Sequence, residues 1–218
     1  MPQQAKVSNK PVHRYTSLAS ALHVLSSNSL TLLPTASWED GNDREYMRIY
    51  SERAEVKCVL ALCLTSASET NHHWSVFASG SDGVRLVMDR SKLQEAVSSD
   101  SSVEFLPVRY ETLQRLRKKR PEVSELPFLK RYPYRGEEEH RLLSRSKEDI
   151  DSYQLTLPPG TVKEVVLSPR LHPDLVEVTK TAIKNASKIA ENGECESVPK
   201  VYRSTLLSND EWVELARN

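Results

Sequence analysis

The stretch Glu55-Val-Lys-Cys-Val-Leu-Ala-Leu-Cys-Leu-Thr65 decides the fold class of this chain. Its inner part, Val59–Leu64, is entirely apolar. A short apolar run between polar flanks is typical of a buried strand. It is the longest apolar run in the sequence, and a membrane helix needs roughly 18 residues. We therefore expect a strand here and no segment that spans a membrane.

Helices and further strands alternate around this run. The other expected strands are His13–Tyr15, Val84–Met88, Val103–Tyr110 (broken by Pro107), Glu137–Ser144, Val162–Leu167 and Val198–Tyr202. Six helices are expected. The first begins after Ser17, the second covers His72–Ser79, and the third runs from Ser91 to about Ser98. A basic helix follows Tyr110, the longest helix begins at Pro173, and the last begins after Asn209 or Asp210. Between them, Leu30–Leu33 is a short apolar run, Trp38–Asp43 a turn-rich loop and Tyr46–Tyr50 a helical turn.

This order of elements predicts the domain organisation. Six or seven strands with helices between them and short connections indicate an α+β fold, with one mixed sheet, split or continuous, flanked by helices. We expect residues 1–11 to be a flexible N-terminus and residues 12–218 to form a single α+β domain.

The charge of the chain is balanced in sum but segregated along the sequence. Its 218 residues include 30 Lys plus Arg and 30 Asp plus Glu, a net charge of zero, which excludes a polycation that coats nucleic acid or membrane. The stretch Pro107–Arg135, however, holds nine basic and three acidic residues, a net charge of +6. Acidic residues cluster directly afterwards, from Glu137 to Glu139.

The compartment is indicated by the cysteines and the N-terminus. Cys58, Cys63 and Cys195 are an odd, sparse set without a C-x-x-C pair, which fits a reducing compartment. The first residues lack the apolar core of a secretory signal. We expect a cytoplasmic protein.

Familiar nucleotide, hydrolase and metal motifs do not occur. The sequence has no G-x-G-x-x-G, no P-loop and no G-x-S-x-G elbow. The neighbours His72 and His73 cannot both reach one metal ion as an i, i+4 pair would, and no H-E-x-x-H is present. We expect no metal site.

Three clusters could carry chemistry. Arg14-Tyr15 lies where the first strand meets the first helix, so Arg14 could fork onto phosphate and Tyr15 stack on a ring; the alternative is a surface Arg beside a core Tyr. The second cluster is the pair of aromatic residues Trp74 and Phe77 on the short helix expected at His72–Ser79, and Trp74 there lines either a pocket or the core.

The third cluster is the acidic strand. Glu137, Glu139 and Arg141 are spaced i, i+2, i+4, so on a strand they share one face. Two adjacent carboxylates raise one pKa, and a nearby Arg tempers that effect. Such a group can stabilise a cationic transition state or orient a hydroxyl. The alternative is a solvated edge strand blunted with charge.

The basic stretch admits two interpretations. It is either a solvated helix face or a surface that binds a nucleic acid or a protein. Basic and aromatic side chains alternate just before the acidic strand, a pattern that fits the second interpretation. The residues concerned are Arg115, Arg117, Lys118, Lys119, Arg120, Lys130 and Arg131.

Taken in order, several motifs resemble the bacterial domain-of-unknown-function family 2971. The matching pieces are VHRYTSLASALHVL, SWEDGNDREYM, ALCLTSASETNHHWSVFASGSDGVRLVMDRSKL, VRY, Lys130, GEEEHRLLS and PGTVKEVVLSP. They correspond to the family's opening (H/R)-Y, its N-D-P-like loop, its W-x-x-Y-A segment, a lysine, an E-x-E-x-R strand and a final strand. Two departures are Arg44, where the family often has Pro, and Phe77, where Tyr is common.

A more distant likeness is to ADP-ribosyltransferases, which show an Arg or His on the first strand, a Ser-containing second strand and a later E-x-E strand. The positions here are Arg14, Ser66, Glu137 and Glu139. The likeness implies an ADP-ribosyltransferase-like fold that binds NAD in the cleft of a split sheet. It implies catalytic roles for Glu139, for its helper Glu137 and for Ser66. The candidate NAD-binding residues are Arg14, Tyr15, Trp74 and Arg141.

Three functions follow as hypotheses. The first is an NAD- or nucleotide-using transferase of the ADP-ribosyltransferase type, acting in bacterial toxin or phage-defence systems. The second is a non-catalytic module that binds a nucleic acid or a protein through residues 107–135. The third is a nuclease or phosphotransferase that uses His13, Arg14 and Arg141 on phosphate.

Overall fold

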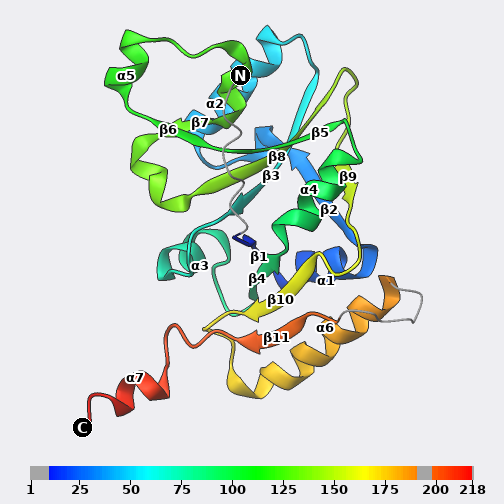
Figure 1. Ribbon diagram of the computed structural model, residues 1–218, viewed down its shortest axis with the longest axis vertical. Coiled ribbons are helices and arrows are strands. Elements are labelled where there is room, and N and C mark those ends of the chain that lie inside the picture. Colours follow the sequence, from blue (N-terminus) through cyan, green and yellow to red (C-terminus); the bar gives the residue numbers. More distant parts are fainter. Residues whose placement is uncertain (1–9, 191–197, 218) are drawn as a thin grey trace.

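A large mixed sheet dominates the structure. The computed structural model describes residues 10–190 and 198–217, so most of the expected flexible N-terminus lies outside the described residues. Within the described ranges, eleven strands and seven α-helices form a single α+β arrangement, which confirms the expected fold class (Figure 1). None of the helices in these ranges is long and apolar enough to cross a membrane.

The main sheet has two halves that meet at one point. One half contains β11 (Lys200–Arg203), β10 (Val162–Leu167), β4 (Gly83–Met88) and β1 (Val12–Ser17). The other contains β5 (Val103–Pro107), β8 (Glu139–Ser146), β3 (Cys58–Thr65), β2 (Ser29–Pro34) and β9 (Tyr153–Thr156). Strands β1 and β3 pair only through His13 and Thr65. The sheet is therefore split between β1 and β3.

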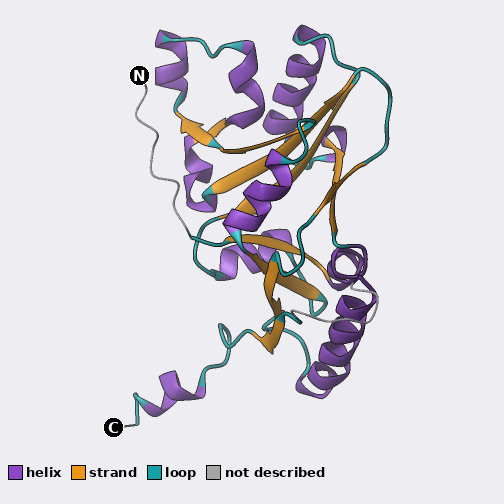
Figure 2. Cartoon of the chain, turned by 45° about the vertical axis from the view of Figure 1, so that its right-hand side comes forward, coloured by secondary structure: helices purple, strands orange, loops and turns teal. Residues whose placement is uncertain are grey.

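Helices cover both faces of the sheet (Figure 2). The helices are α1 (Leu18–Ser27), α2 (Gly41–Arg53), α3 (Asn71–Phe77), α4 (Arg90–Ser98), α5 (Leu113–Lys118), α6 (Val176–Ala190) and α7 (Asp210–Glu214). The 3-10 turns are η1 (Thr35–Ser37), η2 (Val123–Phe128), η3 (Tyr132–Glu137) and η4 (Pro173–Leu175). Strands β6 (Arg109–Glu111) and β7 (Leu129–Arg131) form a separate, two-stranded parallel sheet, and α5 lies in the connection between them.

The apolar run of β3 is buried on both of its faces. Leu60, Leu62 and Leu64 point into the main core, to which α1, α4 and α6 contribute. Val59 and Ala61 point the other way, into a second core under α2 and η2. Because successive side chains of a strand alternate between faces, a strand between two cores needs an unbroken apolar run. The expected strand is confirmed.

A third, smaller core lies on the same face of the sheet as α2, but over the half-sheet that contains β1, β4 and β10. Tyr15, Trp74 and Val166 pack there under α3. Helices α2 and α3 thus cover different halves of the same face, one on each side of the split. The space between them lies directly over the junction of β1 and β3.

Several local expectations were wrong at the helix starts and in the strand count. The segment Trp38–Asp43 is not all loop, because Asp40 caps α2 by accepting from the backbone N–H groups of Asn42 (2.8 Å) and Asp43 (3.3 Å). Likewise, Asp89 rather than Ser91 caps α4. The expected six or seven strands omitted β2, β7 and β9, and took β5 and β6 as one broken strand. These strands are short, and their pairing partners are distant in sequence.

Gly83 begins β4 where the backbone of the preceding turn approaches closely. A Cβ at this position would lie 2.3 Å from the Ala78 carbonyl oxygen. We expect Gly83→Ala to lower the free energy of unfolding by about 1–3 kcal/mol, because a backbone oxygen has to move. Gly136→Ala is the matched control, since a Cβ there meets no atom within 4 Å. Urea denaturation of both variants measures the difference, and equal midpoints would contradict the close approach.

Candidate functional site

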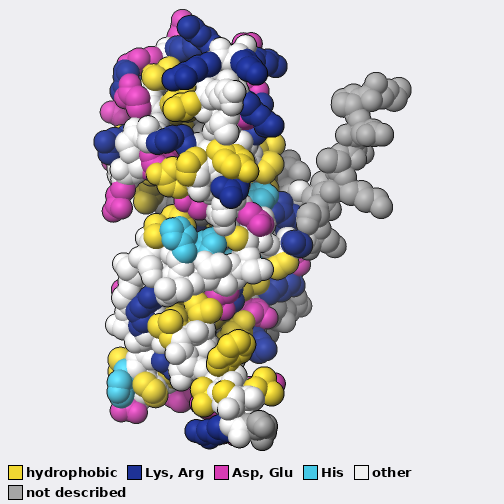
Figure 3. Space-filling view, turned by 90° about the vertical axis from the view of Figure 1, so that its left-hand side faces the viewer, with side chains coloured by type: hydrophobic (Ala, Val, Ile, Leu, Met, Phe, Trp, Pro, Cys, Tyr) yellow, Lys and Arg dark blue, Asp and Glu magenta, His cyan; other side chains and the backbone are white. Residues whose placement is uncertain are grey.

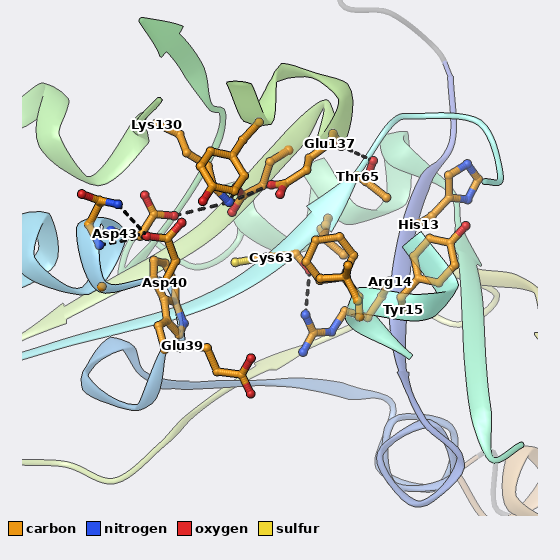
Figure 4. Close-up of a pocket in the computed structure, with 18 residues that line it drawn as sticks. His13, Arg14, Tyr15, Glu39, Asp40, Asp43, Cys63, Thr65, Lys130 and Glu137 are labelled. Atoms are coloured by element: carbon orange, nitrogen blue, oxygen red, sulfur yellow. Dashed lines mark hydrogen bonds and ion pairs between the residues drawn. The ribbon is translucent and has the colours of Figure 1, made fainter. Parts of the chain in front are cut away.

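A cavity of about 770 Å³ opens over the split in the sheet (Figure 4). Its volume lies within the range of roughly 300–1,000 Å³ that is usual for small-molecule sites. Its walls come from β1, β3, α3, the start of α2 and the segment around η3. The lining residues are His13, Arg14, Tyr15, Trp38, Glu39, Asp40, Gly41, Asn42, Asp43, Cys63, Leu64, Thr65, Val76, Phe77, Lys130, Tyr134, Glu137 and Glu139.

One wall of the cavity is a buried cluster of charges around Lys130. The Lys130 Nζ atom lies 2.7 Å from Glu137, 3.1 Å from Glu139 and 3.4 Å from Asp43. The side chains of all four residues are less than a tenth exposed. Buried charges persist only when they are paired and hydrogen-bonded, and Lys130 provides that pairing for three carboxylates at once.

Arg141 completes this cluster from behind the cavity wall. Its guanidinium is 1% exposed and makes a bidentate contact with Glu139, at 2.7 and 3.2 Å. It also lies 2.6 Å from Asp43 and donates to the Pro127 carbonyl oxygen at 2.8 Å. The Trp38 ring stacks against it, with 4.8 Å between the guanidinium carbon and the ring centroid. Arg141 therefore ties α2, η2 and β8 together and holds Glu139 in one orientation.

Within the cluster, the pKa values of the two glutamates shift in opposite directions. Burial raises the pKa of Glu137, and Lys130 only partly offsets this effect. Burial would also raise the pKa of Glu139, but Arg141 and Lys130 outweigh it and lower the pKa to about 2. Glu139 is thus firmly ionised, whereas Glu137 takes up a proton more readily than an ordinary glutamate does. The direction agrees with the expected effect of paired carboxylates, but burial is its main cause and the charge of Glu139 only adds to it.

The backbone around these glutamates differs from the expected strand. Glu137 ends η3, and Glu138 adopts a left-handed conformation with φ of 41°, so only Glu139 and Arg141 belong to β8. The turn still brings Glu137 beside Glu139, through their shared contact with Lys130. The alternative of a solvated edge strand is wrong, because β8 lies between β3 and β5 and its charges are buried.

Arg14 lies across the cavity from this cluster, on β1. Its Nη1 atom donates to the Cys63 carbonyl oxygen at 2.8 Å, bridging the two half-sheets at the split. Arg14 and Glu39 both line the cavity, as Figure 4 shows. The cavity is therefore bipolar, with a carboxylate-rich end and a separate cationic group.

Of the remaining sequence candidates, Tyr15 lines the cavity, whereas Trp74 and Ser66 do not. Trp74 is fully buried and donates from Nε1 to Glu69 at 2.7 Å, so it belongs to the core and not to the cavity wall. Tyr15 packs edge-on against it, at 5.1 Å between ring centroids, and only its outer part reaches the cavity. Ser66 contacts Glu138, at 3.2 Å between Oγ and Oε2, and does not line the cavity. The neighbouring Thr65 does, and its hydroxyl donates to the Glu137 carbonyl oxygen.

The basic stretch is divided by the fold. Lys130 points inward to the carboxylates, so it is not part of an exposed basic surface. Arg115 pairs with Glu111 at 3.7 Å. The exposed bases of this stretch without an ion pair to any described residue are Arg117, Lys118, Lys119, Arg120, Arg131 and Arg135, of which Arg135 lies over the Tyr132 ring.

Asp43 and Trp38 are the site residues that the sequence interpretation missed. Asp43 contacts Arg141 across 98 positions of sequence, a separation at which no spacing rule applies. The signal that existed was the N-D-P-like loop of the family resemblance, which contains Asp43 but assigns it no role. Among the described residues, no group of three or more His, Cys, Asp or Glu side chains is arranged to hold a metal ion.

Comparison with known proteins gives a distant likeness only. No family model matches the chain, so the resemblance to family 2971 is not confirmed, and no curated protein matches it. Among solved structures, the chain is similar to DarT from Thermus sp. 2.9 in complex with ADP-ribosylated single-stranded DNA. The sequence identity is 10% and the TM-score 0.45, over 93% of this chain and 98% of that chain.

Two further structures of the same DarT give similar values. The complex with NAD+ has 11% identity and a TM-score of 0.43, over 92% of this chain and 98% of that one. The complex with carba-NAD+ has 10% identity and a TM-score of 0.41, over 89% and 95%. At such values the likeness establishes neither a common family nor a common activity.

The buried ion cluster predicts a large effect of removing Arg141. Arg141→Met leaves Asp43 and Glu139 without their main partner, and we expect the free energy of unfolding to fall by about 3–5 kcal/mol. Adding Glu139→Gln should recover part of this loss, because one uncompensated charge is then gone. Arg48→Met is the control, since Arg48 also contacts two carboxylates but is exposed. Equal unfolding midpoints for the two Met variants would contradict the role of Arg141.

The His13 imidazole at the split predicts a pH dependence. Burial, followed by the nearby Arg85 and His73, lowers the pKa of His13 from 6.5 to about 4. As the pH falls from about 6.5 to about 4, the unfolded chain binds the proton first, so the free energy of unfolding should decrease in that window. His13→Gln should remove this part of the decrease. NMR titration of the imidazole should give a midpoint near 4, and a midpoint above 6 would refute the prediction.

Proposed function

We propose that this protein is an NAD- or nucleotide-using transferase of the ADP-ribosyltransferase type. The observation that carries the proposal is the bipolar cavity at the split between the half-sheets. Paired glutamates line one end and Arg14 lines another. NAD+ has a cationic nicotinamide ring and an anionic pyrophosphate, and its charges match such a cavity. The volume of about 770 Å³ suits a ligand of dinucleotide type.

The two glutamates would have different roles in the transfer. Cleavage of the bond between nicotinamide and ribose leaves an oxocarbenium-like centre, with the bonding electrons on the departing nicotinamide. Glu139, held ionised by Arg141, would stabilise that centre. Glu137, whose pKa is raised, would orient the acceptor and take its proton as the acceptor bonds to the ribose. The five charges of the cluster sum to one excess negative charge, which favours a cationic centre.

The other candidates would act on the ligand or through these groups. Arg14 would bind phosphate or ribose, and the part of Tyr15 that lines the cavity would contact a ring. Ser66 would support the turn at Glu138. Arg141 and Trp74 do not line the cavity, so we propose that they act as positioning residues, for Glu139 and Tyr15 respectively. We further propose a cytoplasmic bacterial protein of a toxin or phage-defence system.

A non-catalytic binding module is the second candidate function. It is favoured by the bases on and after α5 that form no ion pair within the described chain, namely Arg117, Lys118, Lys119 and Arg120. A protein or a nucleic acid would bind there, with an affinity that falls as salt rises. A nuclease or phosphotransferase is less well supported, because Arg141 is buried away from the cavity.

NAD binding and turnover test the proposed function. We expect calorimetry to detect NAD binding and chromatography to detect nicotinamide release with a suitable acceptor. Glu139→Gln should lower turnover by about 100-fold or more. Arg14→Met should weaken NAD binding by about tenfold. Glu148→Gln, an exposed position beyond the other end of β8, is the matched control and should behave as wild type.

Two outcomes would overturn the assignment. Turnover that Glu139→Gln leaves unchanged, in a variant that melts as a folded protein, would remove Glu139 from the chemistry. Absence of NAD binding by the wild-type chain at millimolar concentration would reject the transferase and favour the binding module.

A further inference from the structure

The segment after β11 leaves the body of the protein and exposes apolar side chains. We call Leu206–Leu215, which contains α7, the C-terminal tail. Trp212 is 77% exposed and Leu215 is 70% exposed. Leu206, Leu207 and Val213 are exposed as well. A cluster of large apolar side chains that contacts little of its own fold marks an interaction site.

The same tail is acidic. Asp210 and Glu211 lie in the first turn of α7, and neither forms an ion pair with a described residue. Glu214 pairs with Arg217 at 2.6 Å. The tail therefore combines an apolar anchor, Trp212, with unpaired negative charge beside it. Its binding partner should combine an apolar slot with positive charge.

The surface around α5 has that combination. A second cavity of about 240 Å³ lies between α2, α5 and β7, with an apolar wall made by Leu113, Leu116 and Leu129. Its polar lining includes Asp43 and Glu111, which are paired with Arg141 and Arg115, so the excess positive charge lies on the bases beside the cavity. Leu113 is 58% exposed at its mouth. The unpaired bases Arg117–Arg120 follow on the same helix and its end, and Lys and Arg side chains gather at this end of the molecule in Figure 3. We call this surface the α5 slot.

The tail and the α5 slot lie at opposite ends of the long axis of the molecule, as Figure 1 shows. They cannot meet within one chain in this arrangement. We propose that the C-terminal tail of one copy binds the α5 slot of a second copy, with Trp212 against Leu113 and Leu116 and with Glu211 facing Lys118. This interface joins different surfaces, so it is heterologous and continues head to tail.

The interface between the tail and the α5 slot is small, so the affinity between two copies should be low. A stable interface buries about 800 Å² per partner, and one short helix with a single indole buries less. Association should therefore be weak and dependent on protein concentration. It should also weaken as salt rises, because opposite charges at its rim attract each other less when they are screened.

Sedimentation velocity of the full chain over a range of concentrations tests the proposal. We expect the weight-average sedimentation coefficient to rise with concentration at low salt and to fall back as salt is added. Trp212→Ala in the tail and Leu113→Ser in the slot should each weaken association about tenfold or more. Leu175→Ser is the matched control, because it removes an exposed leucine (49%) from η4 that belongs to neither surface, and it should leave association unchanged.

Mixing the two variants separates a head-to-tail interface from other modes. Trp212→Ala retains an intact slot and Leu113→Ser an intact tail, so their mixture should form 1:1 dimers that grow no further. The charge exchange Glu211→Lys with Lys118→Glu in one chain should restore association that either change alone reduces.

Several results would overturn the proposal. They are a monomer at every concentration, association that Trp212→Ala leaves intact, and association that depends on Trp212 but not on Leu113. Binding of a single-stranded oligonucleotide that Leu113→Ser and Lys118→Glu abolish, without any self-association, would assign the slot to nucleic acid instead.

Discussion

The buried guanidinium of Arg141 is the group on which the site depends. A cation that is 1% exposed has to be paired, and its partners come from three parts of the chain: Asp43 in α2, Pro127 in η2 and Glu139 in β8. These contacts dock α2 and η2 against the strand that carries the acidic residues. The same carboxylates then recruit Lys130, which in turn holds Glu137. One pairing requirement thus determines the whole carboxylate wall of the cavity.

The second constraint is the split between the half-sheets. Strands β1 and β3 share one residue pair, so most of their facing backbone groups are not paired with each other. A side chain takes over part of this task, since Arg14 on β1 donates to the Cys63 carbonyl on β3. Helices α2 and α3 cover separate halves of the sheet, each over its own small core. The cavity results from the gap between these two cores, with the carboxylate cluster on the side of β3 and β8 and Arg14 on the side of β1.

The balanced charge of the chain also acquires a structural meaning. The basic stretch of net charge +6 is not one surface, because Lys130 is turned inward and Arg109 pairs with Glu125. What remains exposed is the cationic end of the molecule at α5. Some of the acidic residues are gathered too: Asp43, Glu137 and Glu139 lie in the buried cluster, and Asp210 and Glu211 lie in the tail at the opposite end. A net charge of zero therefore hides two local concentrations of charge, the exposed bases at α5 and the buried carboxylates around Lys130.

The sequence by itself determined the elements whose signals are local. The apolar run ending at Thr65 identified β3, Ser17 capped α1, and the i, i+2 spacing put Glu139 and Arg141 on one face of β8. Only the tertiary structure decided that Asp43 and Lys130 join them, that Trp74 lies in the core and that Glu137 belongs to a turn. The reason is physical: strand periodicity and helix capping act over a few residues, whereas a buried charge is paired by whichever group the packing of distant elements brings near it.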